Sequence, residues 1–197
     1  MNSKITPADV NELLRSRRST FNDQFEEGKK IPDEIIWELL RNANNAPSHK
    51  LTEPWRFVVF TGDGLKILGE NQAAIYKENA GTSFKQNKYE KLKTGPLKCS
   101  HVIAIGLKRH ANELPEMEEI ASVACAVQNI YNSLQAYGIG GYWTTGGVTF
   151  MEAAKPFFGL EPDDKLMGFF QLGYIKVPTA PRTPGPIEEK VTWVNGE

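Results

Sequence analysis

The chain has few of the residues and patterns on which several classes of function depend. Its 197 residues include only two cysteines, Cys99 and Cys125, which form neither a CxxC pair nor a disulfide framework. Isolated cysteines fit a reducing compartment, so the expected location is cytoplasmic. No run of about eighteen apolar residues is present, and residues 1–20 are too polar for a signal peptide, so no membrane partner is expected.

Histidine and net charge are also scarce. The three histidines, His49, His101 and His110, do not stand at metal-ligand spacing, so no metal is expected. The formal net charge of -1 provides no basic footprint for nucleic acid. No GxxxxGK[ST] pattern is present, and the glycines at 138–141 follow a predicted helix instead of a strand, which excludes the usual phosphate loops.

The composition is that of an ordinary globular domain, with 40% hydrophobic and 24% charged residues. Capping residues, prolines and apolar residues at helical spacing predict helices at 6–17, 32–46, 115–138 and 149–158, with a solvated helical excursion at 63–93. Aromatic and β-branched residues predict strands at 55–61, 101–107 and 164–175, and another follows the glycines at 138–141. The alternating "VTWV" at 191–194 is a candidate edge strand. This order predicts an α+β sandwich, and no linker divides residues 1–197, so a single domain is expected.

Two cationic segments suit an anionic ligand. "RSRRST", at 15–20, offers guanidinium and hydroxyl donors of the kind that hold a phosphate monoester, although cations at a helix C-terminus are also favoured by the helix dipole. Arg182 stands alone among prolines, in a tail that either delivers it to a fixed position or leaves it solvated.

Two further segments suit a flat ligand. In "YWTTGG", at 142–147, glycines permit close backbone approach and the hydroxyls supply donors, although an ordinary tight turn explains the pattern equally well. "APSHKLTEPWRF", at 46–57, ends a helix, turns and starts a strand; its His49 is, by itself, an ordinary loop residue. Neither cysteine has the setting of a nucleophile, and Cys125 lies on the apolar face of helix 115–138, so it is expected in the core.

Taken in order, "RRS", "APSHKLTEPWRF", "GIGGYWTTGG" and "LGYIKVPTAPRTP" resemble the nitroreductase family of FMN-dependent oxidoreductases, over nearly the whole chain. The first two segments are the most specific, and the likeness is greatest to a small single-domain branch. The resemblance implies an α+β sandwich with a mixed or antiparallel central sheet. It also implies an intertwined homodimer with FMN at the interface, in which helix 116–138 packs against its twin. The C-terminal arm, about 177–197, then extends over the partner subunit.

The resemblance also implies which residues contact FMN. Those for the phosphate and ribityl chain are Arg17, Arg18, Ser19 and Arg182. Those that line the isoalloxazine, largely from the other subunit, are Asn45, Pro47, Ser48 and His49. Those that pass along the ring, with backbone amides near N5 and O4, are Trp143, Thr144, Thr145 and Gly146.

One departure from the family pattern concerns the pyrimidine edge of the flavin. Many members have Asn and Gln where this chain has Leu51 and Glu53, so the usual side-chain amide is missing. His49 or Lys50 is expected to substitute, and the positive charge of Lys50 or of protonated His49 is expected to stabilise the anionic reduced flavin.

The implied activity is the reduction of nitroaromatic, quinone or similar electron-poor small molecules by NADH or NADPH through FMN. The implied mechanism is ping-pong hydride transfer at flavin N5, with no catalytic side chain. Three alternatives remain: dehalogenase-like flavin chemistry, a non-enzymatic FMN-binding redox sensor, and a phosphate-ligand module without flavin. No feature of the sequence separates NADH from NADPH.

Overall fold

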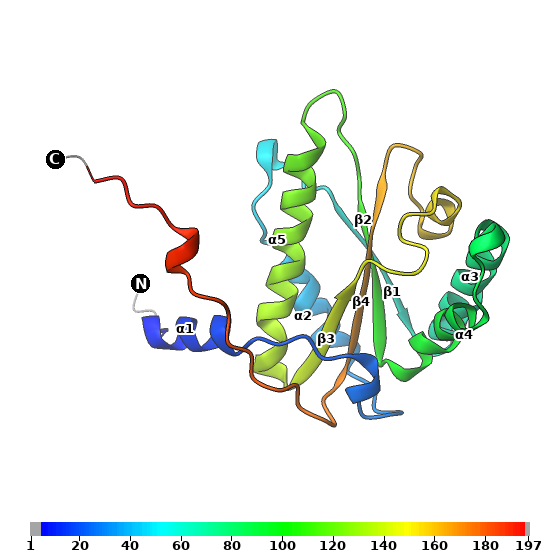
Figure 1. Ribbon diagram of the computed structural model, residues 1–197, viewed down its shortest axis with the longest axis horizontal. Coiled ribbons are helices and arrows are strands. Elements are labelled where there is room, and N and C mark those ends of the chain that lie inside the picture. The colour runs from blue at the N-terminus through cyan, green and yellow to red at the C-terminus, as the bar shows by residue number, and fades with distance from the viewer. Residues whose placement is uncertain (1–4, 196–197) are drawn as a thin grey trace.

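A four-stranded antiparallel sheet lies at the centre of the computed structural model, which describes residues 5–195 (Figure 1). The strands occur in the order β1-β2-β4-β3, so β1 and β3 form the two edges. Their bounds are β1 (Trp55–Thr61), β2 (His101–Leu107), β3 (Ile139–Thr144) and β4 (Lys165–Tyr174). The predicted strands at 55–61, 101–107 and 164–175 and the strand after the glycines are therefore confirmed.

Helices cover both faces of the sheet, as the predicted sandwich requires. One face carries α2 (Asp33–Asn44) and α5 (Glu116–Leu134), and the other carries α3 (Asp63–Asn79) and α4 (Gln86–Thr94) (Figure 1). All seven residues of β2 are buried because both of its faces are covered. The predicted short helix is a 3-10 helix, η6 (Glu152–Phe158), packed on the α3 side.

The first helix, α1 (Pro7–Ser16), forms for the local reasons that its sequence predicts. Thr6 and Asp9 make a capping box: the Asp9 amide donates to Thr6 Oγ1 at 3.3 Å, and the Thr6 amide donates to the Asp9 carboxylate at 2.8 Å. However, α1 buries none of its residues, and Val10 and Leu14 remain 43% and 50% exposed. Residues 5–195 therefore leave the apolar face of α1 largely uncovered.

After β4 the chain leaves the globular body, and residues 176–195 extend away from the sheet on the side of α1 (Figure 1). The first part of this segment is anchored: the amides of Lys176 and Val177 donate to the Gln24 carbonyl, and Thr179 Oγ1 donates to the Ser19 carbonyl. Farther along, Trp193 and Val194 are 83% and 91% exposed. Residues 191–194 form no strand within the chain, so the edge-strand prediction is not met here.

The predicted core position of Cys125 is wrong, because Cys125 is exposed. One face of α5 packs against α2 and the sheet, and Cys125 lies on the other face.

Within residues 5–195, no helix is both long and apolar enough to cross a membrane.

Candidate functional site

The segment 17–20 runs beside the edge strand β3, and glycines make this possible. The Thr20 amide donates to the Gly141 carbonyl at 2.9 Å. A Cβ at Gly140 would stand 2.8 Å from the Thr20 Cβ, so a side chain there would push the two segments apart. The glycine-rich pattern of the sequence thus brings "RRS" and "YWTT" together.

Tyr131 of α5 connects these two segments. Its hydroxyl accepts a hydrogen bond from the Trp143 amide at 2.7 Å and lies 3.3 Å from Ser19 Oγ. The Arg17 guanidinium lies over its ring, 4.8 Å from the centroid. Sequence reasoning gave Tyr131 no role, although a buried tyrosine hydroxyl usually has a polar partner.

Arg18 and Arg182 also come together, although they are far apart in sequence. Arg18 Nη1 donates to the carbonyls of Arg15 and Arg17, both at 2.8 Å, and Nη2 donates to the Arg182 carbonyl at 3.2 Å. Arg18 Nε is buried and has no acceptor among the described residues. The N–H group of Arg18 Nε is therefore a donor that the described residues leave without an acceptor.

The charge of this region is not balanced by acids. Within the described part of the chain, no carboxylate forms an ion pair with Arg17, Arg18 or Arg182. Unpaired guanidinium groups beside the Ser19 hydroxyl are a donor set that suits a phosphate dianion. We call this group, with Tyr131 and Trp143, the arginine cluster.

The loop after α2 adopts an unusual backbone conformation that the sequence did not predict. Lys50, Leu51 and Glu53 have φ angles of 52°, 55° and 43°, in the left-handed region that non-glycine residues avoid. Each costs on the order of 1–3 kcal/mol unless its surroundings hold it. Ser48 Oγ accepts from the Glu53 amide at 3.2 Å, which closes the turn.

This loop is fastened to the N-terminal end of α5. His49 Nδ1 contacts the Glu118 carboxylate, and Lys50 Nζ donates to the Glu113 carbonyl at 3.1 Å. Glu118 and Tyr131 stand thirteen positions apart on α5, which corresponds to about 20 Å. Within one chain, therefore, the predicted residues of segment 45–50 do not join the arginine cluster.

A small cavity of about 130 Å³ lies beside the predicted flavin-lining turn. Thr144, Gly146 and Gly147 form one wall, and the Gly146 amide donates to Thr144 Oγ1 at 3.2 Å. Sequence reasoning missed the other polar residues that line this cavity, which are Asn22, Gln72, Lys91 and Gln171. Gln72 and Lys91 were missed because the sequence indicated only a solvated helical excursion at 63–93.

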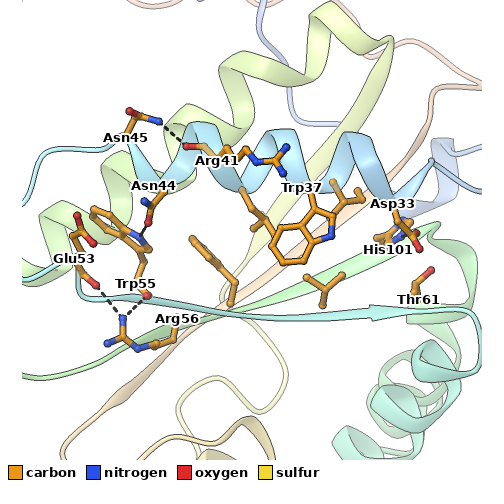
Figure 2. Close-up of a pocket in the computed structure, with 14 residues that line it drawn as sticks. Asp33, Trp37, Arg41, Asn44, Asn45, Glu53, Trp55, Arg56, Thr61 and His101 are labelled. Atoms are coloured by element: carbon orange, nitrogen blue, oxygen red, sulfur yellow. Dashed lines mark hydrogen bonds and ion pairs between the residues drawn. The ribbon is translucent and has the colours of Figure 1, made fainter.

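A larger groove, of about 910 Å³, lies elsewhere, between α2 and the edge strand β1. Figure 2 shows Trp37 over its middle, Asn45 and Arg56 toward one end, and His101 at the other. Of the predicted site residues it includes only Asn45, so its size does not identify it as the flavin site. Trp37 is 61% exposed, which is unusual for a tryptophan.

Two of the buried titratable groups outside the arginine cluster have shifted pKa values, His101 and Cys99. Burial lowers the pKa of His101, although its contact with Asp33 partly opposes this shift. Burial raises the pKa of Cys99 to about 12, so its thiol remains protonated near neutral pH. Cys99 is therefore no nucleophile, as the sequence indicated.

Comparisons with known proteins agree with this architecture. YdjA of Escherichia coli strain K12, whose name provisionally assigns it NAD(P)H nitroreductase activity, is 30% identical over 182 residues, which cover 90% of this chain and 96% of YdjA. Iodotyrosine deiodinase 1 of Sus scrofa is 28% identical over 195 residues, covering 88% of this chain and 65% of the deiodinase.

Solved structures show the same fold. The nitroreductase-like family protein of Bacillus cereus has a TM-score of 0.80 at 22% identity, with both chains fully covered. A Bacteroides fragilis nitroreductase with bound FMN has a TM-score of 0.70 at 18% identity, covering 95% of this chain and 99% of that one. Residues 14–174 match the sequence model of the Nitroreductase family, and the chain belongs to that family.

Proposed function

We propose that this protein is an FMN-dependent oxidoreductase that uses NADH or NADPH to reduce nitroaromatics, quinones or similar electron-poor small molecules. The observation that carries the proposal is the arginine cluster, with the buried and unpartnered Nε of Arg18. A flavin phosphate would supply the missing acceptor and the missing negative charge. The FMN bound to the Bacteroides fragilis relative and the activity in the name of YdjA support this choice of ligand.

Bound FMN would supply the redox chemistry, taking two electrons from the nicotinamide and giving them to the acceptor. The chain would hold the phosphate through Arg17, Arg18, Ser19 and Arg182. Tyr131 would keep Trp143 and Ser19 in a fixed relation, and the amides of Thr144, Thr145 and Gly146 would line the ring. No side chain is assigned a proton transfer.

The proposed active form is a homodimer of single-domain subunits. Because α5 separates the loop from the arginine cluster, Asn45, Pro47, Ser48 and His49 would complete the flavin site of the partner. The exposed apolar face of α1, the outer face of α5 and the arm from 177 onward would then be covered by the partner. Light scattering tests this state, and Trp193→Glu is expected to increase the monomer fraction.

The visible spectrum of the purified protein tests the cofactor. We expect flavin absorbance bands, which bleach under anaerobic conditions when NADH or NADPH is added and return when a nitroaromatic or a quinone follows. A colourless protein that takes up no added FMN would contradict the proposal. A flavin that neither nucleotide bleaches would instead indicate a redox sensor.

Reductive dehalogenation is the second candidate, favoured by the similarity to iodotyrosine deiodinase 1. Both functions share the flavin site, so the acceptor distinguishes them. Iodide release from 3-iodotyrosine, measured with the reduced protein, would support the second candidate. Rapid nitroaromatic turnover without iodide release would support the first.

A further inference from the structure

The cavity beside Thr144 and Gly147 contains an amide side chain that has nothing to bind. Gln72 of α3 is only 5% exposed, and its side chain makes no hydrogen bond with any residue in the described range 5–195. Neither amide atom is fully enclosed, so the amide keeps some contact with solvent and remains available to a ligand. Gln171 of β4 lines the same cavity and is likewise without a side-chain partner among the described residues.

Lys91 of α4 adds a positive charge to this cavity. Its ammonium group forms no ion pair or hydrogen bond with any residue that the structure describes. Lys50 and His49, the cations that the sequence suggested for the flavin, are held by Glu113 and Glu118 at the N-terminal end of α5, far from the arginine cluster of the same subunit. Lys91 is therefore the cation with which this subunit itself lines the cavity beside the turn at 144–147.

The two helices that carry Gln72 and Lys91 are rigidly joined. A Cβ at Gly69 would stand only 2.2 Å from the Lys93 carbonyl oxygen, so α3 and α4 touch backbone to backbone there. Tyr76 adds a second connection, since its hydroxyl accepts from the Lys85 amide at 3.0 Å. The residues of this side of the cavity are thus held in place on packed helices.

We infer that Gln72 and Lys91 hold the pyrimidine edge of the flavin and replace the amide that this chain lacks at Leu51 and Glu53. This inference rests on the proposed function. The edge presents a carbonyl, an N–H and a second carbonyl in sequence, and a glutamine amide offers both a donor and acceptors for them. A cavity of about 130 Å³ would hold one edge of the isoalloxazine ring. The remainder of the ring would lie outside the cavity, along residues 143–146.

The ammonium of Lys91 also has an electrostatic role in this arrangement. Negative charge on a reduced flavin is concentrated at N1 and the adjacent carbonyl of the pyrimidine edge. A cation fixed there stabilises the reduced form more than the oxidised form, and so raises the midpoint potential. Lys91 and Gln72 are positioning residues, since they hold the cofactor and the flavin performs the reaction.

The test uses full-length protein reconstituted with FMN, and compares Lys91→Gln with Lys93→Gln. Both variants remove one positive charge from the same helix, but Lys93 does not line the cavity. For Lys91→Gln we expect FMN affinity to fall roughly tenfold or more, as for one charge-assisted hydrogen bond. We also expect a lower midpoint potential, which Lys91→Arg restores. Lys93→Gln should match the wild type in both measurements.

Two further variants complete the test. Gln72→Leu should weaken the binding of FMN, and circular dichroism checks that this variant folds. Lys91 is exposed, so Lys91→Gln does not disturb the hydrophobic core. If Lys50→Gln lowers the potential and Lys91→Gln does not, the inference is wrong. A wild-type chain that takes up no FMN overturns the proposed function as well, whereas normal FMN binding by Lys91→Gln and Gln72→Leu overturns only this inference.

Discussion

Replacing Arg18 with alanine tests the arginine cluster most directly. Its Nη atoms donate to backbone carbonyls, and only Nε, which is buried and unpartnered, remains for a ligand. One hydrogen bond to a charged group contributes about 1.5–3 kcal/mol, so Arg18→Ala should weaken FMN by roughly ten- to a hundredfold. The loss should be specific to the phosphate, because Arg18 makes no other proposed contact with the cofactor.

Isothermal titration of the apoprotein with FMN and with riboflavin separates the phosphate from the ring. Arg18→Ala should weaken FMN and leave riboflavin affinity close to that of the wild type. Arg15→Ala is the matched control, since it removes a nearby charge whose side chain is exposed and contributes no part of the cluster. Equal losses for the two ligands, or unchanged FMN affinity, would refute the role of Arg18 in phosphate binding.

Two further predictions concern stability. His101 is buried and its pKa is lowered mainly by burial, so it is neutral in the fold. The unfolded chain takes up its proton below about pH 6.5, and the free energy of unfolding should therefore fall as pH drops through that value. Urea denaturation at several pH values checks this, and His101→Gln should flatten the dependence. Gly141→Ala places a Cβ 2.5 Å from the Phe170 ring and should lower the free energy of unfolding by about 1–3 kcal/mol. Gly64→Ala, whose Cβ would have no atom nearer than 3.9 Å, should be neutral or stabilising. Equal effects of the two substitutions on the free energy of unfolding would contradict the packing argument.

The sequence predicted the elements of this fold well because each has local signals. The capping box at Thr6 and the apolar positions of α2 act within one or two turns of helix. The meeting of "RRS" with "YWTT" was reached only through the family resemblance. It depends on the absence of a side chain at Gly140, which matters only once two distant segments touch.

The rest of the candidate site depends on contacts that local patterns do not encode. Gln72 and Lys91 stand on helices with weak amphipathicity, so only the packing of α3 against α4 reveals the cavity that they share. The spacing of Tyr131 in the sequence is that of an apolar helix face. Its role follows from the contacts of its hydroxyl with the Trp143 amide and Ser19 Oγ, which the sequence does not show. The predicted core position of Cys125 was wrong because helical spacing shows which residues of α5 share a face, but not which of these faces other elements cover.

The fastening of the loop at 45–50 to one end of α5, with Tyr131 near the other, has a genetic consequence. In the proposed dimer each helix serves two different flavin sites, one at each end. A mixed dimer of one copy altered at Arg18 and one altered at Ser48 would have one site with both defects and one site with neither. Two alleles that are each inactive alone would thus complement each other, because one of the two sites in every mixed dimer would work.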